Sequence, residues 1–348
     1  MKILITGAAG FLGLHLSHQF DKPTNQLRLL DIAEFDPKEY KSNRFQFLKV
    51  DIRDKKSINA ALSGVDYVIH AAAALPLWPK EDIMNVNVNG TENLLQAALK
   101  NKIKHFVYIS STAVYGVPKK HPIYETDPMV GVGPYGESKI QAEKLCVKYR
   151  KKGLIVTIIR PKTFIGTHRL GVFEILFDWI KDGKKIPVLG NGQNRYQLLN
   201  VDDLADAVER VLLTKQKSKV NDVFNIAAEK FETVEKDLSA VFSYAKSGSK
   251  ILKTPAGLIK KTLYVLEKLH LSPLYQWVYE TADKDSFVSI EKLKKALKWS
   301  PKYSNADSLI QSYKWYEKNY KNIKKQGSGV THTVGWKQGI LGLFKKFL

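Results

Sequence analysis

The chain of 348 residues contains a single cysteine, Cys146, which excludes an intramolecular disulfide and a zinc site built from several cysteines. It has no run near the roughly 20 apolar residues that a membrane-spanning helix needs, and no apolar signal-peptide core follows its first residues. Arginine is scarce, with 8 residues against 47 lysines. These absences predict a globular protein with a large apolar core in a reducing, cytoplasmic compartment.

The formal net charge is +21, from 55 basic and 34 acidic residues. Such a field favours anionic partners, which include phosphorylated metabolites, anionic lipid and nucleic acid. The lysines are scattered along predicted helices and are not clustered with aromatic residues, so nucleic-acid binding is not expected. Most of them are best interpreted as a solvated coat.

Short β-rich runs alternate with helical patterns over the first 160 residues. Strands are predicted at 2–6, 27–31, 45–50, 67–71, 104–110 and 154–159, and helices at 11–20, 55–62, 82–100 and 134–152. This alternation predicts an α/β fold with a parallel sheet. Further elements are expected as a helix at 172–181, a strand at 196–200 that returns to the sheet, a helix at 202–213 and a strand at 223–226.

The same patterns predict two domains and a C-terminal appendage. A nucleotide-binding domain is expected at 1–162 plus about 196–228, a smaller helix-rich substrate domain at about 163–195 plus 229–322, a linker at 323–335 and a tail at 336–348.

The tail has the pattern of an amphipathic helix. Its apolar face would hold Trp336, Ile340, Leu343, Phe344 and Phe347, with Gln338, Lys345 and Lys346 opposite. Such a helix is expected to dock on protein or to lie in a membrane interface, which would place the protein at the inner face of a membrane.

The segment Thr6-Gly-Ala-Ala-Gly-Phe-Leu-Gly13 follows a predicted strand and opens a helix. Glycines there let the backbone turn tightly and approach a pyrophosphate, while the helix N-terminus offers free N–H groups. A glycine triplet alone is weak evidence for a dinucleotide site, but here the strand–turn–helix context that accompanies such a site is present. The expected cofactor contacts are Gly7, Ala9, Gly10, Phe11, Leu12 and Gly13.

Asp31 ends the second predicted strand, 24 residues after Gly7. A carboxylate there can accept hydrogen bonds from both ribose hydroxyls of NAD and would repel the 2′-phosphate of NADP, so NAD is favoured. The alternative is a solvated aspartate at a strand end. Asp51 and Ile52 follow the third strand, where a side chain can cover the adenine.

Tyr135-Gly-Glu-Ser-Lys139 places a tyrosine and a lysine on one face of a helix. The ammonium, together with a positive nicotinamide, is expected to lower the phenol pKa from its usual ~10. The phenolate could then take a proton from a substrate hydroxyl as hydride leaves the same carbon. Tyr115, Tyr264 and Tyr320 begin pairs of the same spacing, but only Tyr135 opens a helix after the fifth strand.

Ile109-Ser-Ser-Thr-Ala-Val-Tyr-Gly116 lies at the C-terminal end of the fifth predicted strand, where ligands bind in open parallel sheets. A hydroxyl there can hydrogen-bond the reacting oxygen and share its proton with Tyr135. On chemistry alone Ser110, Ser111 or Thr112 could serve.

Together these motifs resemble the extended short-chain dehydrogenase/reductases of the NAD-dependent epimerase/dehydratase group, over about residues 1–320. The resemblance implies a Rossmann, doubly wound parallel sheet with a smaller substrate domain, NAD as cofactor, and a homodimer. The segments that carry it are Thr6–Gly13, Asp31, Asp51-Ile52, His70–Ala73, Asn87–Thr91, Ser110–Gly116, Tyr135–Lys139, Arg160-Pro161 and Val201–Asp203.

The resemblance also implies roles. Ser111 corresponds to the catalytic Ser/Thr, Tyr135 to the general acid/base, and Lys139 to the residue that tunes the tyrosine and holds the nicotinamide ribose. Asn87 corresponds to the helix asparagine near the active site. The remaining cofactor contacts expected are Ala71, Ala72, Ala73 and Pro161.

Departures from the family pattern bear on the reaction. Thr112 and Ala113 stand where the family's dehydratases carry acidic residues. Because water elimination needs a second acid/base, a dehydratase is disfavoured.

Other departures bear on the substrate. No asparagine occurs in the run 160–164 and no arginine near 281, although Arg195 and Lys284 could compensate, and the loop 75–78 is apolar. These features lean towards the 3β-hydroxysteroid dehydrogenase-like branch, with hydrophobic substrates. The expected substrate contacts are Trp78, Ser111, Thr112, Thr163 and Arg195.

Three functions remain open at this point. The first is an NAD-dependent epimerase or oxidoreductase acting on a nucleoside-diphosphate sugar. The second is a dehydrogenase or reductase of a hydrophobic alcohol or ketone at a membrane surface. The third, a non-catalytic NAD-binding sensor, is disfavoured by the complete set of Ser111, Tyr135 and Lys139. No metal site is expected, since His15 and His18 lie on a helix behind the glycine loop.

Overall fold

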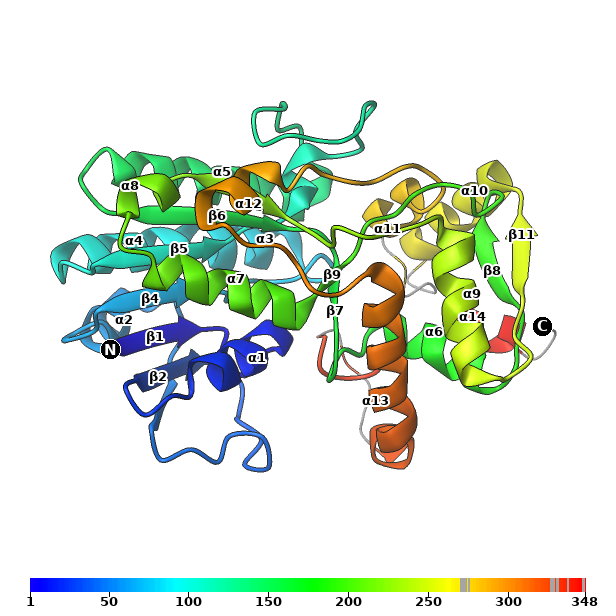
Figure 1. Cartoon of the computed structure of the whole chain (residues 1–348), viewed down its shortest axis with the longest axis horizontal. Coiled ribbons are helices and arrows are strands. Elements are labelled where there is room, and N and C mark those ends of the chain that lie inside the picture. Colours follow the sequence, from blue (N-terminus) through cyan, green and yellow to red (C-terminus); the bar gives the residue numbers. More distant parts are fainter. Residues whose placement is uncertain (270–273, 275, 326–328, 330–331, 337, 346–347) are drawn as a thin grey trace.

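The computed structural model describes residues 1–269, 274, 276–325, 329, 332–336, 338–345 and 348. A central sheet of seven parallel strands has the order β10-β6-β5-β4-β1-β2-β3 (Figure 1). Six of them form the 3-2-1-4-5-6 order of a doubly wound sheet, in which ligands bind where the order reverses, beside β1 and β4. The strands are β1 (Lys2–Thr6), β2 (Gln26–Asp31), β3 (Phe45–Lys49), β4 (Tyr67–His70), β5 (His105–Ile109), β6 (Val156–Pro161) and β10 (Val223–Ile226).

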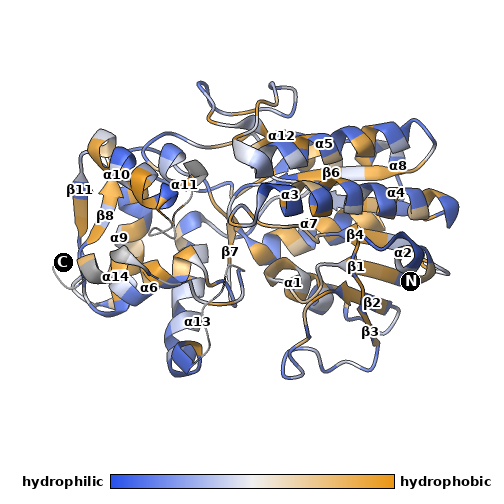
Figure 2. Cartoon of the chain, turned by 180° about the vertical axis from the view of Figure 1, so that it is seen from behind, coloured by the Kyte–Doolittle hydropathy of each residue, from blue (hydrophilic) through white to orange (hydrophobic). Residues whose placement is uncertain are grey.

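Helices cover both faces of this sheet, so its central strands are apolar on both sides. All residues of β5 and β6 are buried, and Figure 2 shows the sheet strands as mainly hydrophobic ribbons between helices with hydrophilic outer turns. One face packs against α1 (Phe11–Phe20), α7 (Val201–Leu213) and α12 (Glu291–Leu297), and the other against α2 (Lys55–Ala61), α4 (Thr91–Lys100) and α5 (Gly133–Arg150).

The segment predicted as one helix at 82–100 consists of three consecutive helical pieces. They are α3 (Lys80–Met84), a π-helical turn η1 (Asn85–Gly90) and α4. Such π turns occur often at functional sites, and this one contains Asn87.

A second group of elements has a core of its own. Its members are α6 (Val172–Lys181), β8 (Ile186–Leu189), α9 (Val234–Ala245), β11 (Ile251–Thr254), α10 (Ala256–Lys268), α11 (Gln276–Thr281) and α13 (Asn305–Lys325), on the right of Figure 1. Strand β8 pairs with β11, and α13 packs against α9 and α6. Buried Phe177, Trp179, Tyr313 and Tyr316 build this core. The division into domains given above stays a prediction.

One strand was predicted in the wrong sheet. Within 196–200 only Leu199–Asn200 is a strand, β9, and it pairs with β7 (Phe164–Ile165) instead of the central sheet. The Asn200 side chain accepts a hydrogen bond from the Asp202 N–H and caps α7, which ends the strand early. The other short helices are η2 (Thr112–Tyr115), α8 (Lys217–Val220) and α14 (Ile340–Phe344).

The C-terminal segment docks on α6. The Leu170 N–H donates to the His332 carbonyl (2.9 Å) and the Gly171 N–H to that of Val334 (3.1 Å). Trp336 is only 6% exposed and packs over Gly171. Docking on the protein's own body, one of the two expectations for the tail, therefore describes this segment.

The predicted amphipathic helix over 336–348 is wrong in its extent and orientation. Of the described residues in this range, only those of α14 form an α-helix, and α13 already extends into the predicted linker. Lys345 of the predicted polar face pairs with Asp178 (2.5 Å) and Asp182 (2.6 Å), whereas Phe344 of the apolar face is 51% exposed. The buried carboxylate of Asp178 on α6 and the exposed one of Asp182 at the end of that helix attract the cationic side of the tail. Lys346 and Phe347 lie outside the described residues, within which no helix is long and apolar enough to cross a membrane.

Candidate active site

The glycine loop lies between β1 and α1 and has no room for side chains. Gly7 has φ +68°, and a Cβ there would stand 2.7 Å from the Cα of Ala72. A Cβ on Gly13 would meet the carbonyl oxygen of Gly7 at 2.2 Å. Glycine at these two positions lets the loop turn and lets α1 pack directly against it, which leaves the N-terminus of α1 open to a phosphate.

Asp31 stands beside this loop at the end of β2. Its Oδ2 accepts a hydrogen bond from the Ala9 N–H (3.0 Å) and its Oδ1 one from the Ala33 N–H (3.0 Å). The carboxylate is thus fixed beside the glycine loop, with lone pairs left for further donors. The small side chains of Ala71, Ala72 and Ala73 follow β4 on the other side of the loop.

The residues predicted to cover the adenine are engaged within the protein. Asp51 accepts hydrogen bonds from the Arg53 backbone and guanidinium (2.6 to 3.0 Å). Ile52 is 4% exposed and packs in the core beneath Gly90. Their contact with a cofactor stays a prediction.

Tyr135 and Ser111 meet in one pocket, as the sequence predicts. Tyr135 lies in the first turn of α5, and Ser111 follows β5, with its Oγ capping η2 through the Ala113 N–H (3.1 Å). Burial raises the pKa of Tyr135 to about 12, against the opposing effects of the nearby Ser111 hydroxyl and of the charge of Arg169.

The expected lowering of the Tyr135 pKa by Lys139 is therefore not found. The Lys139 Nζ donates to the Ile109 carbonyl (2.9 Å) and lies 5.8 Å from the centroid of the Tyr135 ring. It is 2% exposed, and burial lowers its pKa to about 8 although Glu143 opposes this. A carbonyl at the end of β5 thus holds the amine, and burial weakens its charge.

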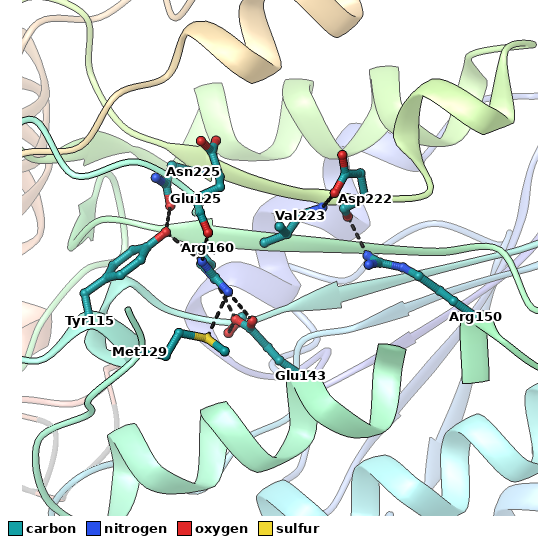
Figure 3. A network of polar contacts seen from close by, with 10 residues as sticks. Tyr115, Glu125, Met129, Glu143, Arg150, Arg160, Asp222, Val223 and Asn225 are labelled. Atoms are coloured by element: carbon teal, nitrogen blue, oxygen red, sulfur yellow. Dashed lines mark hydrogen bonds and ion pairs between the residues drawn. The ribbon is translucent and has the colours of Figure 1, made fainter. Parts of the chain in front are cut away.

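A buried ion pair anchors the helix that carries Tyr135 (Figure 3). Arg160 on β6 donates to Glu143 on α5 through Nε (2.9 Å) and Nη2 (2.5 Å), and both side chains are under 5% exposed. Ser110 Oγ also donates to Glu143 (2.5 Å), and Arg160 Nη1 donates to the Tyr115 hydroxyl (2.7 Å). Ser110 is thereby committed to this network, which leaves Ser111 as the serine that meets Tyr135.

Asn87 joins the loop after β4 to α5. Its Oδ1 accepts from the Ala74 N–H (2.8 Å), and its Nδ2 donates to the Ala74 carbonyl (3.2 Å) and to Ser138 Oγ (3.0 Å). The amide donors are used inside the protein, so Asn87 positions these two segments. Its predicted contact with the cofactor stays a prediction.

The pocket around Ser111 and Tyr135 has a volume of about 200 Å³. Predicted residues among its walls are Thr112, Pro161 and Thr163. The others are Leu75, Pro76, Ser110, Ala113, Val132, Gly133, Pro134, Lys162, Phe164, Arg169, Glu267 and His332. The sequence reasoning missed Lys162, Arg169, Glu267 and His332. Only Lys162 had a signal, because it lies in the run after Arg160 that departs from the family pattern.

Two predicted substrate residues do not line this pocket. Leu75 and Pro76 of the apolar loop do so, but Trp78 does not. Arg195 is exposed and stacks on Phe231 and Phe287, with its guanidinium carbon 4.6 and 4.9 Å from the ring centroids. Their substrate contacts stay predictions.

The two helix histidines have protein partners. His15 contacts Asp202 Oδ1 (2.9 Å) and the Thr167 carbonyl (3.0 Å), and His18 contacts the Glu39 carbonyl (2.8 Å). In the described part of the chain, no three His, Cys, Asp or Glu side chains gather as a metal site.

Comparison with known proteins identifies the family. The sequence model of the NAD dependent epimerase/dehydratase family matches residues 3–227. The "Uncharacterized protein y4nG" of Sinorhizobium fredii is 35% identical, over 98% of this chain and 84% of its own length. The UDP-glucose 4-epimerase of Lactobacillus helveticus is 28% identical, over 93% of this chain and 99% of its own.

The fold has known counterparts as well. The crystal structure of the UDP-glucuronic acid 4-epimerase from Bacillus cereus in complex with NAD is similar, with a TM-score of 0.76 and 24% identity, over 92% of this chain and all of its own. The family match covers the sheet, the glycine loop, Ser111 and Tyr135 together. The chain therefore belongs to the NAD-dependent epimerase/dehydratase family and is an enzyme of the extended short-chain dehydrogenase/reductase type.

Proposed function

We propose that the protein is an NAD-dependent epimerase that inverts a secondary alcohol carbon of a nucleoside-diphosphate sugar. The observation that carries the proposal is that Tyr135 and Ser111 line one pocket. The likeness to a UDP-glucose 4-epimerase supports a nucleotide sugar as substrate.

The residues present fit NAD. Gly7 and Gly13 form a cradle that a Cβ would fill, and the fixed Asp31 carboxylate suits ribose hydroxyls but would repel a 2′-phosphate. NAD is therefore proposed over NADP. When bound, NAD supplies hydride acceptance from the alcohol carbon and hydride return.

Tyr135 is proposed to take the proton of the substrate hydroxyl and later to give it back. Ser111, which lines the same pocket, would hold the reacting oxygen and stabilise the phenolate. Because burial keeps the phenol protonated, a positive group beside it is needed for the phenolate to form. Lys139, held by the Ile109 carbonyl, contributes a partly charged amine near the ring.

A dehydratase is disfavoured by the site itself. Thr112 and Ala113 follow Ser111, and both are buried and carry no acid. Of the described pocket residues only Glu267 is a carboxylic acid, and it accepts a hydrogen bond from the Tyr279 hydroxyl (2.5 Å). It comes from α10, far in the sequence from the catalytic turn.

One measurement tests this proposal first. The purified protein is denatured, and the nucleotide released is quantified. We expect the denatured protein to release near-stoichiometric NAD. We also expect the native protein to interconvert 4-epimeric UDP-sugars with no net rise in the absorbance at 340 nm that NADH would cause. Absence of turnover with every nucleotide sugar tried would refute it.

A second candidate is a dehydrogenase of a hydrophobic alcohol or ketone. It is favoured only by the apolar Leu75 and Pro76 in the pocket wall. Such an enzyme would exchange its cofactor in each cycle, so little nucleotide would be released on denaturation, and NAD reduction would be seen with apolar alcohols.

A further inference from the structure

A buried amine stands in the wall of the pocket, and the proposed chemistry does not use it. Lys162 directly follows β6 and is 2% exposed. Its Nζ donates to Ser286 Oγ (2.7 Å) and lies 4.7 Å from the centroid of the Tyr196 ring. Among the residues that the structure describes, no carboxylate lies within 4.0 Å of this Nζ.

Side chains with hydroxyl groups lie beside the amine. The hydroxyls of Thr163 and Thr281 oppose the rise that burial causes in the pKa of Tyr196, and Thr281 and Ser286 are both buried. We name Lys162, Thr163, Tyr196, Thr281 and Ser286 the ammonium–hydroxyl cluster. Three segments that are distant in sequence converge to form it, so a local sequence pattern does not reveal it.

The cluster is costly for the protein without a ligand. Burial lowers the pKa of Lys162 to about 7, so the amine is only partly charged near neutral pH. Buried charges in proteins are normally paired, because an unpaired one loses its hydration. One of the three ammonium N–H groups is seen to donate, to a hydroxyl. A bound anion would supply both the missing charge and the missing acceptors.

The position of the amine limits which anion this can be. Lys162 and Thr163 line the same pocket as Ser111 and Tyr135. Because the reacting sugar ring has to reach Tyr135, we assign an anion that Lys162 meets in the same pocket to that ring.

Resting on the proposed function, we propose that the sugar of the substrate carries a carboxylate, as in a nucleoside-diphosphate hexuronate, and that Lys162 binds this carboxylate. The Ser286 hydroxyl, which accepts a hydrogen bond from Nζ, holds the amine in place. Arg169, which also lines the pocket, adds positive charge to the same wall. Lys162 is thus a specificity-determining residue that separates uronate sugars from neutral ones.

The experiment compares two nucleotides that differ only at the sugar C6. Binding of UDP-glucuronate, UDP-glucose and UDP is measured by calorimetry with the NAD-containing protein, followed by rates of C4 epimerisation. The variants are Lys162→Met and, as a charge-matched control, Lys185→Met, which removes an exposed lysine outside the pocket.

Wild type and Lys185→Met are expected to prefer UDP-glucuronate over UDP-glucose by about 10- to 100-fold, the usual strength of a charged hydrogen bond. Lys162→Met should lose that preference, with UDP-glucose affected less than about threefold, since a neutral sugar makes no such bond. Its thermal midpoint should not fall, because a buried amine is replaced by an apolar side chain of similar length.

Equal affinity of the wild type for the two sugars overturns the inference, and this needs no variant that folds. An equal loss for all three ligands in Lys162→Met also overturns it, because the amine would then serve the diphosphate. If none of the three nucleotides binds, the proposed function itself fails and the inference fails with it.

Discussion

Removing Glu143 should destabilise the protein far more than removing Glu143 and Arg160 together. The pair is bidentate, both side chains are under 5% exposed, and Ser110 and Tyr115 complete the network. Burial lowers the pKa of Arg160, and the hydrogen bonds to Glu143 raise it. Because a guanidinium does not deprotonate in proteins, Arg160 remains charged after Glu143 is lost. An uncompensated buried charge of this kind costs about 3–5 kcal/mol.

For a chain of this length, each kcal/mol shifts the thermal midpoint by about 1.4 °C. Glu143→Ala should therefore unfold about 4–7 °C below the wild type in a calorimetric scan. The double variant Glu143→Met with Arg160→Met should regain most of this loss, because an apolar pair of similar volume carries no charge to solvate. A loss below about 2 °C for Glu143→Ala, or losses that simply add in the double variant, would refute the reasoning.

Three further outcomes follow from the site and the tail. Tyr135→Phe should lower kcat by orders of magnitude while NAD binding, measured by calorimetry, is retained; unchanged turnover would remove the phenol from the mechanism. Trp336→Ala should lower the thermal midpoint by several degrees, because it empties the contact over Gly171, whereas Phe344→Ala, on an exposed residue of the same segment, should not. The folded-state pKa of Lys162 lies below its unfolded value of 10.5, so the unfolded chain binds more protons between about pH 7 and 10. The free energy of unfolding should therefore rise with pH through that window more steeply in the wild type than in Lys162→Met, by up to about 1.4 kcal/mol per pH unit. Parallel pH profiles of the two proteins would contradict this.

The sequence predicts the sheet well because each strand is a short apolar run that the fold buries on both faces. Strand 223–226 and helix 172–181 were placed correctly at both ends. The strand at 196–200 was misplaced because its apolar residues are buried against β7 and not in the central sheet. A local pattern reports that a segment is buried, and it does not report against which partner.

The same limit explains what could be predicted of the site. Tyr135 and Ser111 were found from their positions after β5, and the structure joins them. The lowering of the Tyr135 pKa that we expected from Lys139 depends on the direction of the Lys139 amine. That amine donates its hydrogen bond to the Ile109 carbonyl and not to the phenol. Glu143 continues the four-residue spacing of Tyr135 and Lys139 along α5 and could have been found, whereas His332 reaches the pocket from the far end of the chain.

Burial acts in one direction on the titratable groups at the centre of the pocket. It raises the pKa of Tyr135 to about 12 and lowers those of Lys139 and Lys162 to about 8 and about 7. Each shift favours the neutral form, so these three groups carry less charge than they would in water. A cationic ring beside Tyr135 favours the phenolate, and a carboxylate beside Lys162 favours the ammonium. The bound cofactor and substrate thus stabilise the charged forms of Tyr135 and Lys162 that catalysis and recognition need. The cost of burying these charges then arises only when a correct ligand offsets it.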